Sequence, residues 1–218
     1  YELPQGSPTT RGKPFVQLLP FEEDERVSSV LPIDDFEEGK FVVSATKGGI
    51  VKRTELIQYQ NVHSGGIIAL GLKEGDELVS VKLTEPGDWM FLASRKGQSI
   101  RFDQEDARAM GRTAAGVFGM RFKEDDDYLV SAEVIPNNFE DYKILTLCEN
   151  GHGKRTEVEE YSVQGRGGMG NITIQTTDRN GDVVGVRVVG ENDELMLITN
   201  MGQIIRTRVA EISVYGRN

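Results

Sequence analysis

Short apolar runs alternate with glycine turns and basic strands along most of the chain. Four stretches, TKGGIVKRT, SRKGQSIRF, CENGHGKRT and TNMGQIIRT, each follow an apolar run typical of a strand and place a basic residue four positions after a glycine. The pairs are Gly48 with Lys52, Gly97 with Arg101, Gly151 with Arg155, and Gly202 with Arg206. Successive glycines are 49, 54 and 51 residues apart. This spacing predicts a repeated strand, turn and strand.

A second element recurs with the same period. The stretches DERVSSV, DELVSVK, DYLVSAE and GDVVGVR contain Val27, Val79, Val130 and Val184, at intervals of 52, 51 and 54 residues. Two independent anchors with one period predict an all-β, propeller-like array of four-stranded blades, each about 50 residues long. We expect a single domain, or a fragment of one, over 1–218, with units at 40–88, 89–141 and 142–193. Partial units at 1–39 and 194–218 either complete each other in a ring of four or adjoin further blades.

Helical patterns are nearly absent. The stretches RTELIQYQ, FDQEDARAM and RTEVEEYS are expected to be helical turns or ordered connections, and they lead into a glycine-rich loop seen in VHSGGI, MGRTAAGV, QGRGGMGN and YGRN. Within one copy, Gly165, Gly167 and Gly170 satisfy G-x-G-x-x-G, but the NITIQTT that follows alternates as a strand does. Without a helix N-terminus for a pyrophosphate, this pattern argues against a dinucleotide site and for close backbone approach.

Composition narrows the class of protein. A chain of 218 residues with 38% hydrophobic content is long enough to bury a sizeable core. The lone cysteine, Cys148, lies in an apolar strand pattern, which predicts a buried inert thiol. No apolar run approaches the ~20 residues needed to span a membrane, so a soluble, cytoplasmic protein is expected. His63 and His152 lack ligand spacing, and neither a metal site nor a bound cofactor is expected.

The basic residues concentrate in two phases of the repeat, although the net charge is −10. Of the 25 Lys and Arg residues, 16 lie there. The turn and its outgoing strand hold Lys47, Lys52, Arg53, Arg95, Lys96, Arg101, Lys154, Arg155, Arg206 and Arg208, and the glycine loop and its approach hold Arg11, Lys13, Arg108, Arg112, Arg166 and Arg217. Acidic clusters occupy other phases, at 22–25, 34–38, 73–77 and 123–127.

This segregation predicts a basic band on one surface, because phase in a repeat corresponds to position on the array. Charges beside turns are often merely solvated, but a basic residue recurring on every unit suits the repeated phosphates of double-stranded DNA. Phosphate contacts position a duplex without reading its sequence. We therefore predict DNA contact for these 16 residues and hypothesise that the acidic segments compete with DNA for the band.

The chain resembles a known family at specific strings. FEEGKFVVSATKGGIVKRT, ARAMGRTAAGV, NGHGKRTEVEEY, DRNGDVVGVRVV and DELMLITNMGQIIRTRVAEISVYGRN resemble the carboxyl-terminal domain of DNA gyrase A subunits, and the likeness runs through essentially the whole chain. The resemblance implies a six-bladed β-pinwheel, whose blades exchange strands and which wraps DNA around a basic rim. That wrap supports ATP-dependent negative supercoiling by a bacterial type IIA topoisomerase, assembled from two A and two B subunits. The catalytic tyrosine, the ATPase and its Mg²⁺ lie outside this domain, which implies no catalytic centre here.

The glycine loop at 164–170 resembles that family's hallmark heptapeptide in part. Five positions of QGRGGMG agree with Q-R-R-G-G-K-G, whereas Gly165 and Met169 stand where the family has basic residues. The hallmark belongs to an earlier blade, so we expect a weaker copy in which Arg166 contacts DNA. The corresponding domain of topoisomerase IV A subunits remains an alternative. A protein-binding propeller such as a WD40 scaffold is another, although Trp89 is the only tryptophan and W-D is absent.

Overall fold

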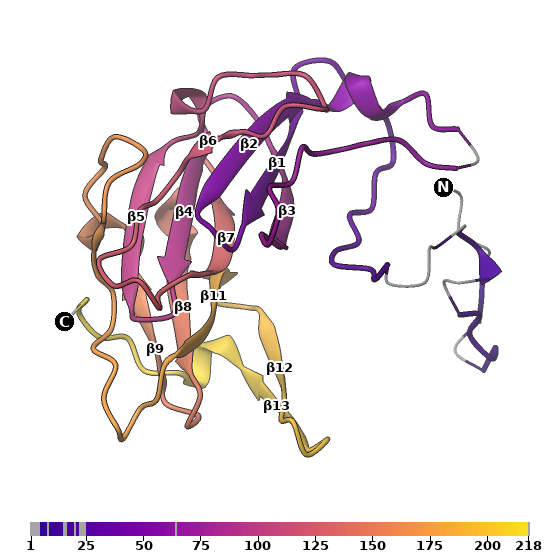
Figure 1. Ribbon diagram of the computed structural model, residues 1–218. Coiled ribbons are helices and arrows are strands. Elements are labelled where there is room, and N and C mark those ends of the chain that lie inside the picture. The colour runs from indigo at the N-terminus through magenta and orange to yellow at the C-terminus, as the bar shows by residue number, and fades with distance from the viewer. Residues whose placement is uncertain are drawn as a thin grey trace.

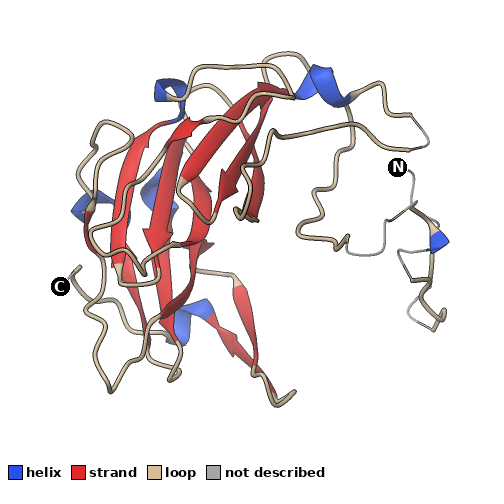
Figure 2. Ribbon diagram, in the orientation of Figure 1, coloured by secondary structure: helices blue, strands red, loops and turns tan. Residues whose placement is uncertain are grey.

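The computed structural model describes residues 5–7, 9–14, 17–19, 21, 25–63 and 65–217. In that part, short antiparallel strands form small sheets that stand side by side (Figures 1 and 2). The strands are β1 (Phe41–Thr46), β2 (Ile50–Glu55), β3 (Leu78–Thr84), β4 (Trp89–Ser94), β5 (Gln98–Asp103), β6 (Val117–Phe118), β7 (Leu129–Ile135), β8 (Tyr142–Cys148), β9 (Gly153–Glu157), β10 (Asn171–Ile172), β11 (Val183–Gly190), β12 (Glu194–Ile198) and β13 (Ile204–Arg208). The 3₁₀ helices are η2 (Leu56–Tyr59), η3 (Gln104–Asp106), η4 (Phe139–Asp141), η5 (Val158–Glu160) and η6 (Val209–Glu211). The all-β prediction is confirmed, and three of the 3₁₀ helices occupy the expected helical turns.

Each four-stranded sheet combines strands from two consecutive units of the repeat. The first sheet has the order β3-β1-β2-β6 and the second has the order β10-β5-β4-β7. One unit supplies a hairpin and an inner strand, and the next unit supplies a two-residue outer strand. Val117 of β6 thus pairs with Val51 of β2, and Asn171 of β10 pairs with Ser99 of β5. The third sheet is β11-β8-β9. The strand exchange implied by the resemblance is confirmed.

The hairpin turns share one backbone conformation. Gly49, Gly97, Gly151 and Gly202 all have φ of +79°, a left-handed conformation that residues with a Cβ rarely adopt. A Cβ added at Gly97 would lie 2.2 Å from the carbonyl oxygen of Ile174, so the close approach of the next unit's loop also requires glycine there. The turn thus fixes both the hairpin and the position of its neighbour.

The equivalent glycine in the first hairpin is Gly49, not Gly48. Pairing Gly48 with Lys52 is therefore wrong by one position, because Gly49 is the residue with the left-handed φ. Counted from the left-handed glycines, the basic residues four positions on are Arg53, Arg101, Arg155 and Arg206. The repeat thus aligns four arginines.

The core lies between neighbouring sheets. On β4, Met90 and Leu92 face a cluster that includes residues of β1 and β2, whereas Phe91 and Ala93 face a second cluster that includes residues of β8 and β11. Successive side chains of a strand point to opposite faces, so a strand covered on both faces needs apolar residues at every position. Cys148 is 1% exposed in the second cluster, and burial raises the pKa of its thiol, as expected for an inert core cysteine.

The two partial units do not pair with each other among the described residues. The β12–β13 hairpin is a two-stranded sheet that extends away from the others in Figure 1. The described residues between 25 and 39 form no strand, and Val27 and Val30 are 42% and 58% exposed. The strand expected around Val27 is therefore not formed, and a closed ring of four is absent from this part of the chain.

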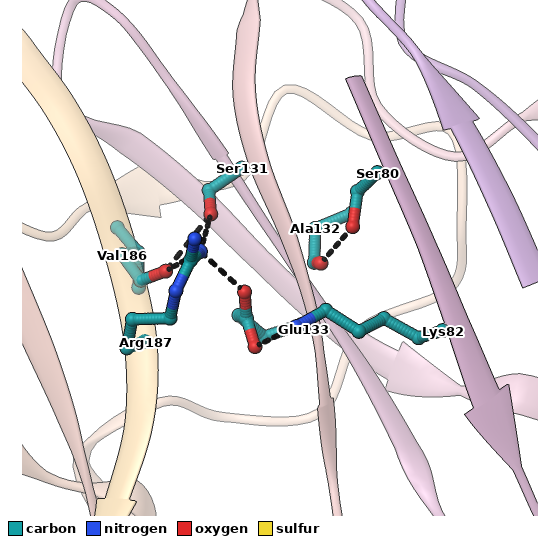
Figure 3. Close-up of polar contacts among 7 residues, drawn as sticks. All are labelled: Ser80, Lys82, Ser131, Ala132, Glu133, Val186 and Arg187. Atoms are coloured by element: carbon teal, nitrogen blue, oxygen red, sulfur yellow. Dashed lines mark hydrogen bonds and ion pairs between the residues drawn. The ribbon is translucent and has the colours of Figure 1, made fainter. Parts of the chain in front are cut away.

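The innermost strands of three sheets meet at a buried carboxylate. β7 lies between β3 and β11, and Glu133 of β7 has a side chain that is only 7% exposed. Lys82 Nζ of β3 donates to one of its oxygens at 2.9 Å, and Arg187 Nη1 of β11 donates to the other at 2.7 Å (Figure 3). Glu133 thus links three consecutive units through charge-assisted hydrogen bonds.

Candidate nucleic-acid interface

Five of the cations predicted to contact DNA are buried. Lys52, Arg53, Arg101, Lys154 and Arg155 are 0%, 8%, 5%, 8% and 4% exposed. Their assignment to a DNA-contacting band is corrected here, because a side chain held inside the fold cannot reach a phosphate while its internal contacts persist. A buried cation requires a partner, and each of these finds one in the next unit of the repeat.

Arg101 shows how the buried arginines are held. Its Nη1 lies 3.3 Å from the carbonyl oxygen of Val158, the first residue of the 3₁₀ helix η5 of the following unit, and 3.5 Å from that of Tyr161, which follows this helix. The guanidinium also lies 4.7 Å from the ring centroid of Trp89 and 4.6 Å from that of Phe139. Burial lowers the pKa of Arg101, opposed by the charge of Glu159. Carbonyl acceptors and aromatic faces are the partners that a planar guanidinium suits.

The same contact recurs one unit earlier and one unit later. Arg53 Nη1 donates to the carbonyl of Ala107 at 3.4 Å, and Arg155 Nε donates to the carbonyl of Ile212 at 2.7 Å. Arg206 holds the same register in β13, but no 3₁₀ helix of a following unit exists among the described residues, and its side chain is 67% exposed. The recurring arginine therefore joins one unit to the next.

Two lysines one position earlier in the repeat hold the glycine loops. Lys52 Nζ donates to the carbonyls of Ala69 and Arg112, and Lys154 Nζ donates to the carbonyl of Gly216 at 2.5 Å. Desolvation by burial lowers the pKa of Lys52 to about 8, and burial also lowers the pKa of Lys154. These ammonium groups stabilise the loops from inside.

The cations at the hairpin turns face carboxylates. Lys96 Nζ lies 3.3 Å from a carboxylate oxygen of Asp126, and Arg95 Nη2 lies 2.5 Å from one of Asp182. The other pairs of this kind are Lys47 with Glu77 and Arg206 with Glu194. Their positive charge is largely balanced locally, which weakens their attraction for an external phosphate.

Acidic residues also form part of the turn structure itself. Asp76 accepts hydrogen bonds from the Thr46 hydroxyl at 2.6 Å and from the Gly48 backbone N–H at 2.8 Å. Asp127 accepts from the Ser94 hydroxyl at 2.7 Å in the equivalent position of the next unit. The sequence alone indicates only that both carboxylates belong to acidic clusters, and it does not predict their role in the turns. The recurring Thr or Ser just before the glycine turn was the available signal.

The glycine-rich loops form a continuous rim along the outer edges of the sheets. Loops 61–72, 107–122 and 161–174 are joined to one another by backbone hydrogen bonds, so that each loop lies against the next. The Gly71 N–H donates to the carbonyl of Ala114 at 3.1 Å, and the Arg121 N–H donates to that of Gly168 at 2.9 Å. We call these three loops the rim.

The rim is basic and lacks carboxylates. Its residues include Arg108, Arg112, Arg121 and Arg166 and no Asp or Glu. Arg108, Arg121 and Arg166 are exposed and Arg112 is half-buried. Within the described residues, none of these four takes part in an ion pair, unlike the cations of the hairpin turns. The structure thus assembles three predicted residues and adds Arg121, which was not among the predicted cations although it lies in the same loop.

Two of the rim arginines bridge neighbouring loops while remaining accessible. Arg112 Nη1 donates to the carbonyl of Ile68 at 2.9 Å. Arg166 Nε and Nη1 donate to the carbonyls of Asp106 and Phe118 at 2.8 and 3.1 Å. Each guanidinium retains further N–H groups for an outside acceptor.

The remaining predicted cations lie elsewhere. Arg11 and Lys13 are exposed in the described segment 9–14, Arg208 is exposed at the end of β13, and Arg217 is half-buried beside the last glycine loop. For these the prediction of DNA contact stays a prediction.

The QGRGGMG loop is part of this rim. Gly167 and Gly170 have φ of +78° and +67°, and a Cβ added at Gly170 would lie 2.2 Å from the carbonyl oxygen of Ser99. Strand β10 follows the loop. Gly170 therefore serves close packing against β5, as expected, and the strand that follows the loop excludes the dinucleotide interpretation.

Two features are absent from the described part of the chain. It contains no helix that is both long and apolar enough to cross a membrane. Nor do its His, Cys, Asp and Glu side chains gather anywhere in a group of three or more that could hold a metal ion.

Comparisons with known proteins agree along the whole chain. The family model described as the DNA gyrase C-terminal domain, beta-propeller, matches residues 1–34, 40–85, 88–136, 143–190 and 193–218. The DNA gyrase A subunit of Salmonella typhimurium is 46% identical and that of Escherichia coli K12 is 44% identical, each over 218 residues. These alignments cover 100% of the chain but 24% of each relative, so the chain spans about a quarter of their length.

Solved structures confirm the fold. The C-terminal domain of a DNA topoisomerase IV superposes with a TM-score of 0.86 at 28% identity, covering 94% of this chain and 64% of that one. A DNA gyrase A C-terminal domain superposes with a TM-score of 0.85 at 23% identity, covering 95% of this chain and 69% of that one. The two superpositions are equally good, so the fold does not distinguish the two families.

Proposed function

Since this chain belongs to the DNA gyrase C-terminal domain family, we propose that it binds double-stranded DNA along the rim and bends it without reading its sequence. In this proposal it acts within a gyrase A polypeptide, together with the rest of that polypeptide and with gyrase B polypeptides in an A2B2 assembly. Wrapping DNA around the rim supports negative supercoiling in the bacterial cytoplasm, and other parts of the assembly bind ATP and Mg²⁺.

One observation carries the proposal: the rim holds four arginines and no carboxylate in a chain of net charge −10. Of the other predicted cations, five are buried against carbonyls, and Lys47, Arg95, Lys96 and Arg206 face carboxylates. Arginines without acidic partners, spaced along connected loops of consecutive units, suit an extended polyanion.

The proposal requires contacts spread over several units. Bending 20 to 30 base pairs by 40 to 90° costs about 1 to 6 kcal/mol, and each phosphate contact repays only part of it. The rim supplies Arg112 and Arg166 from two consecutive units in equivalent positions. Repetition of the same contact along a curved edge lets a duplex follow that edge.

Salt dependence of binding tests the proposal. Four phosphate contacts give a slope of about −4 in log affinity against log salt, since each contributes about −0.9. R108A/R121A should reduce the slope by about 2, because both side chains are exposed and neither is ion-paired within the described residues. K47A/K96A is the matched control: both lysines are predicted by sequence to contact DNA, yet they face Glu77 and Asp126. Its slope should equal that of the wild type.

A wild-type slope near zero would contradict DNA binding and favour a protein-binding scaffold. Equal effects of the two double variants would place the DNA on the hairpin turns instead. A second assay separates the proposal from the topoisomerase IV alternative. The chain is bound to nicked circular DNA, the nick is sealed, and the linking number is measured; wrapping of the gyrase type shifts it.

A further inference from the structure

The rim carries an exposed apolar residue at the same position in each of three consecutive units. Gly66, Gly116 and Gly170 have φ of +80°, +95° and +67°, and the residues two positions later are Ile68, Phe118 and Ile172. These three side chains are 65%, 38% and 37% exposed. They are 50 and 54 residues apart, so they follow the period of the repeat. Isolated exposed apolar residues need no explanation, but three in one register do.

The outer strands explain why two of these side chains, those of Phe118 and Ile172, face outward. Phe118 pairs with Ile50, and Ile172 pairs with Gln98, in strands only two residues long at the sheet edge. Val117, the other residue of β6, packs against the core cluster. Because alternate residues point to opposite faces, Phe118 is turned away from that cluster.

Each of the first two apolar residues accepts a hydrogen bond from a rim arginine. Arg112 donates to the carbonyl of Ile68, and Arg166 donates in the same way to the carbonyl of Phe118. The Phe118 ring centroid also lies 4.4 Å from the guanidinium carbon of Arg121 and 5.5 Å from Lys73 Nζ. An apolar surface surrounded by cations matches a partner in which apolar and anionic groups alternate closely.

We propose that Ile68, Phe118 and Ile172 pack against the deoxyribose groups of the bound duplex, between the phosphates that the rim arginines contact. This rests on the proposed function, since it assumes that DNA follows the rim. The DNA backbone alternates phosphates with sugars that carry C–H groups, and proteins contact both without reading sequence. Burying these side chains increases the affinity without releasing counterions. This contribution to the affinity therefore does not depend on the salt concentration.

The test is the triple variant I68T/F118T/I172T of the 218-residue chain, with the dissociation constant for a DNA duplex measured across a salt series. Threonine removes apolar surface from each site and retains strong strand propensity. We expect binding about tenfold weaker at every salt concentration, with an unchanged slope. The matched control, V184T/I198T/M201T, removes exposed apolar groups outside the rim, where the side chains are 50%, 66% and 84% exposed. It should bind like the wild type.

A conservative variant separates lost apolar contact from altered folding. I68L/F118L/I172L keeps an apolar group at each site and should bind within about twofold of the wild type. Unchanged affinity of the threonine variant, a changed slope, or an equal loss in the leucine or control variant would each overturn the proposal. Failure of the proposed function looks different, because the wild type would then bind weakly with a shallow slope.

Discussion

Glu133→Gln removes the charge that links three consecutive units. The carboxylate accepts hydrogen bonds from Lys82 and Arg187 on the two neighbouring inner strands (Figure 3). Glutamine has nearly the same size but only one acceptor oxygen, and it offers N–H groups where a cation lies. The substitution therefore leaves the packing intact and breaks one or both charge-assisted hydrogen bonds.

The expected loss of stability depends on the exposed fraction of each side chain in the pair. Removing one partner of a fully buried ion pair costs about 3 to 5 kcal/mol. Here the carboxylate side chain is 7% exposed, but those of Lys82 and Arg187 are 33% and 60% exposed and regain water when released. We therefore expect a smaller loss of about 1 to 2 kcal/mol. For a chain of 218 residues this lowers the melting temperature by roughly 2 to 8 °C.

Thermal unfolding followed by circular dichroism measures this shift, with Glu157→Gln as the control. Glu157 pairs with Lys143 at 3.5 Å, but its side chain is 44% exposed, so its substitution should cost less than about 0.5 kcal/mol. In the linking-number assay, E133Q should also give a smaller shift, because the inner strands fix the angle between blades. A melting temperature of E133Q within about 1 °C of the wild type would refute the view that this carboxylate holds the units together.

Two further predictions concern the buried cations. Arg101→Lys should lower the free energy of unfolding, measured in urea, by about 2 kcal/mol, because lysine cannot stack between Trp89 and Phe139. A loss no larger than that of the exposed control Arg108→Lys would contradict this. The pKa of Lys52 is lowered to about 8 from 10.5, so between these pH values the unfolded chain binds more protons than the folded one. The free energy of unfolding of the wild type relative to that of Lys52→Met should therefore rise with pH in this interval, by about 1 to 3 kcal/mol in total. If this difference stays constant or falls with pH, Lys52 keeps its ordinary pKa.

The sequence predicted the repeat well because its signals are local. A strand, a turn glycine and a second strand lie within about a dozen residues, and turn glycines have strict backbone requirements. The one error of register, Gly48 for Gly49, arose where two adjacent glycines both satisfied the pattern. Exchange of the outer strands came from the resemblance alone, because pairing between β6 and β2 joins residues far apart in the chain.

The buried cations could not be recognised from periodicity. A basic residue repeated on every unit can bind the repeated phosphates of an external DNA duplex. The neighbouring units, however, present backbone carbonyl groups with the same period in the interior of the protein. A signal was present in the incoming strands. The hairpins of Arg53 and Arg101 begin with Phe41 and Trp89, whose ring centroids lie 3.8 and 4.7 Å from the guanidinium carbons, whereas the hairpin of exposed Arg206 begins with Glu194. An aromatic residue diagonally across a hairpin from an arginine offers a face on which the guanidinium can be buried.

The distribution of acidic residues shows how a chain of net charge −10 can offer a basic edge. Asp76 and Asp127 accept hydrogen bonds within the hairpin turns, and Asp126 faces Lys96 there. These carboxylates therefore act at the turn end of each sheet and cannot leave it without exposing the donors that they satisfy. Among the described residues, acidic segments form ion pairs with turn cations, such as Lys96 with Asp126. That acidic segments compete with DNA stays a hypothesis, and residues 22–24 of the first acidic cluster lie outside the described part of the chain. Net charge governs the long-range field, but within one Debye length of the rim, about 8 Å at physiological salt, the local charges determine whether a phosphate is attracted.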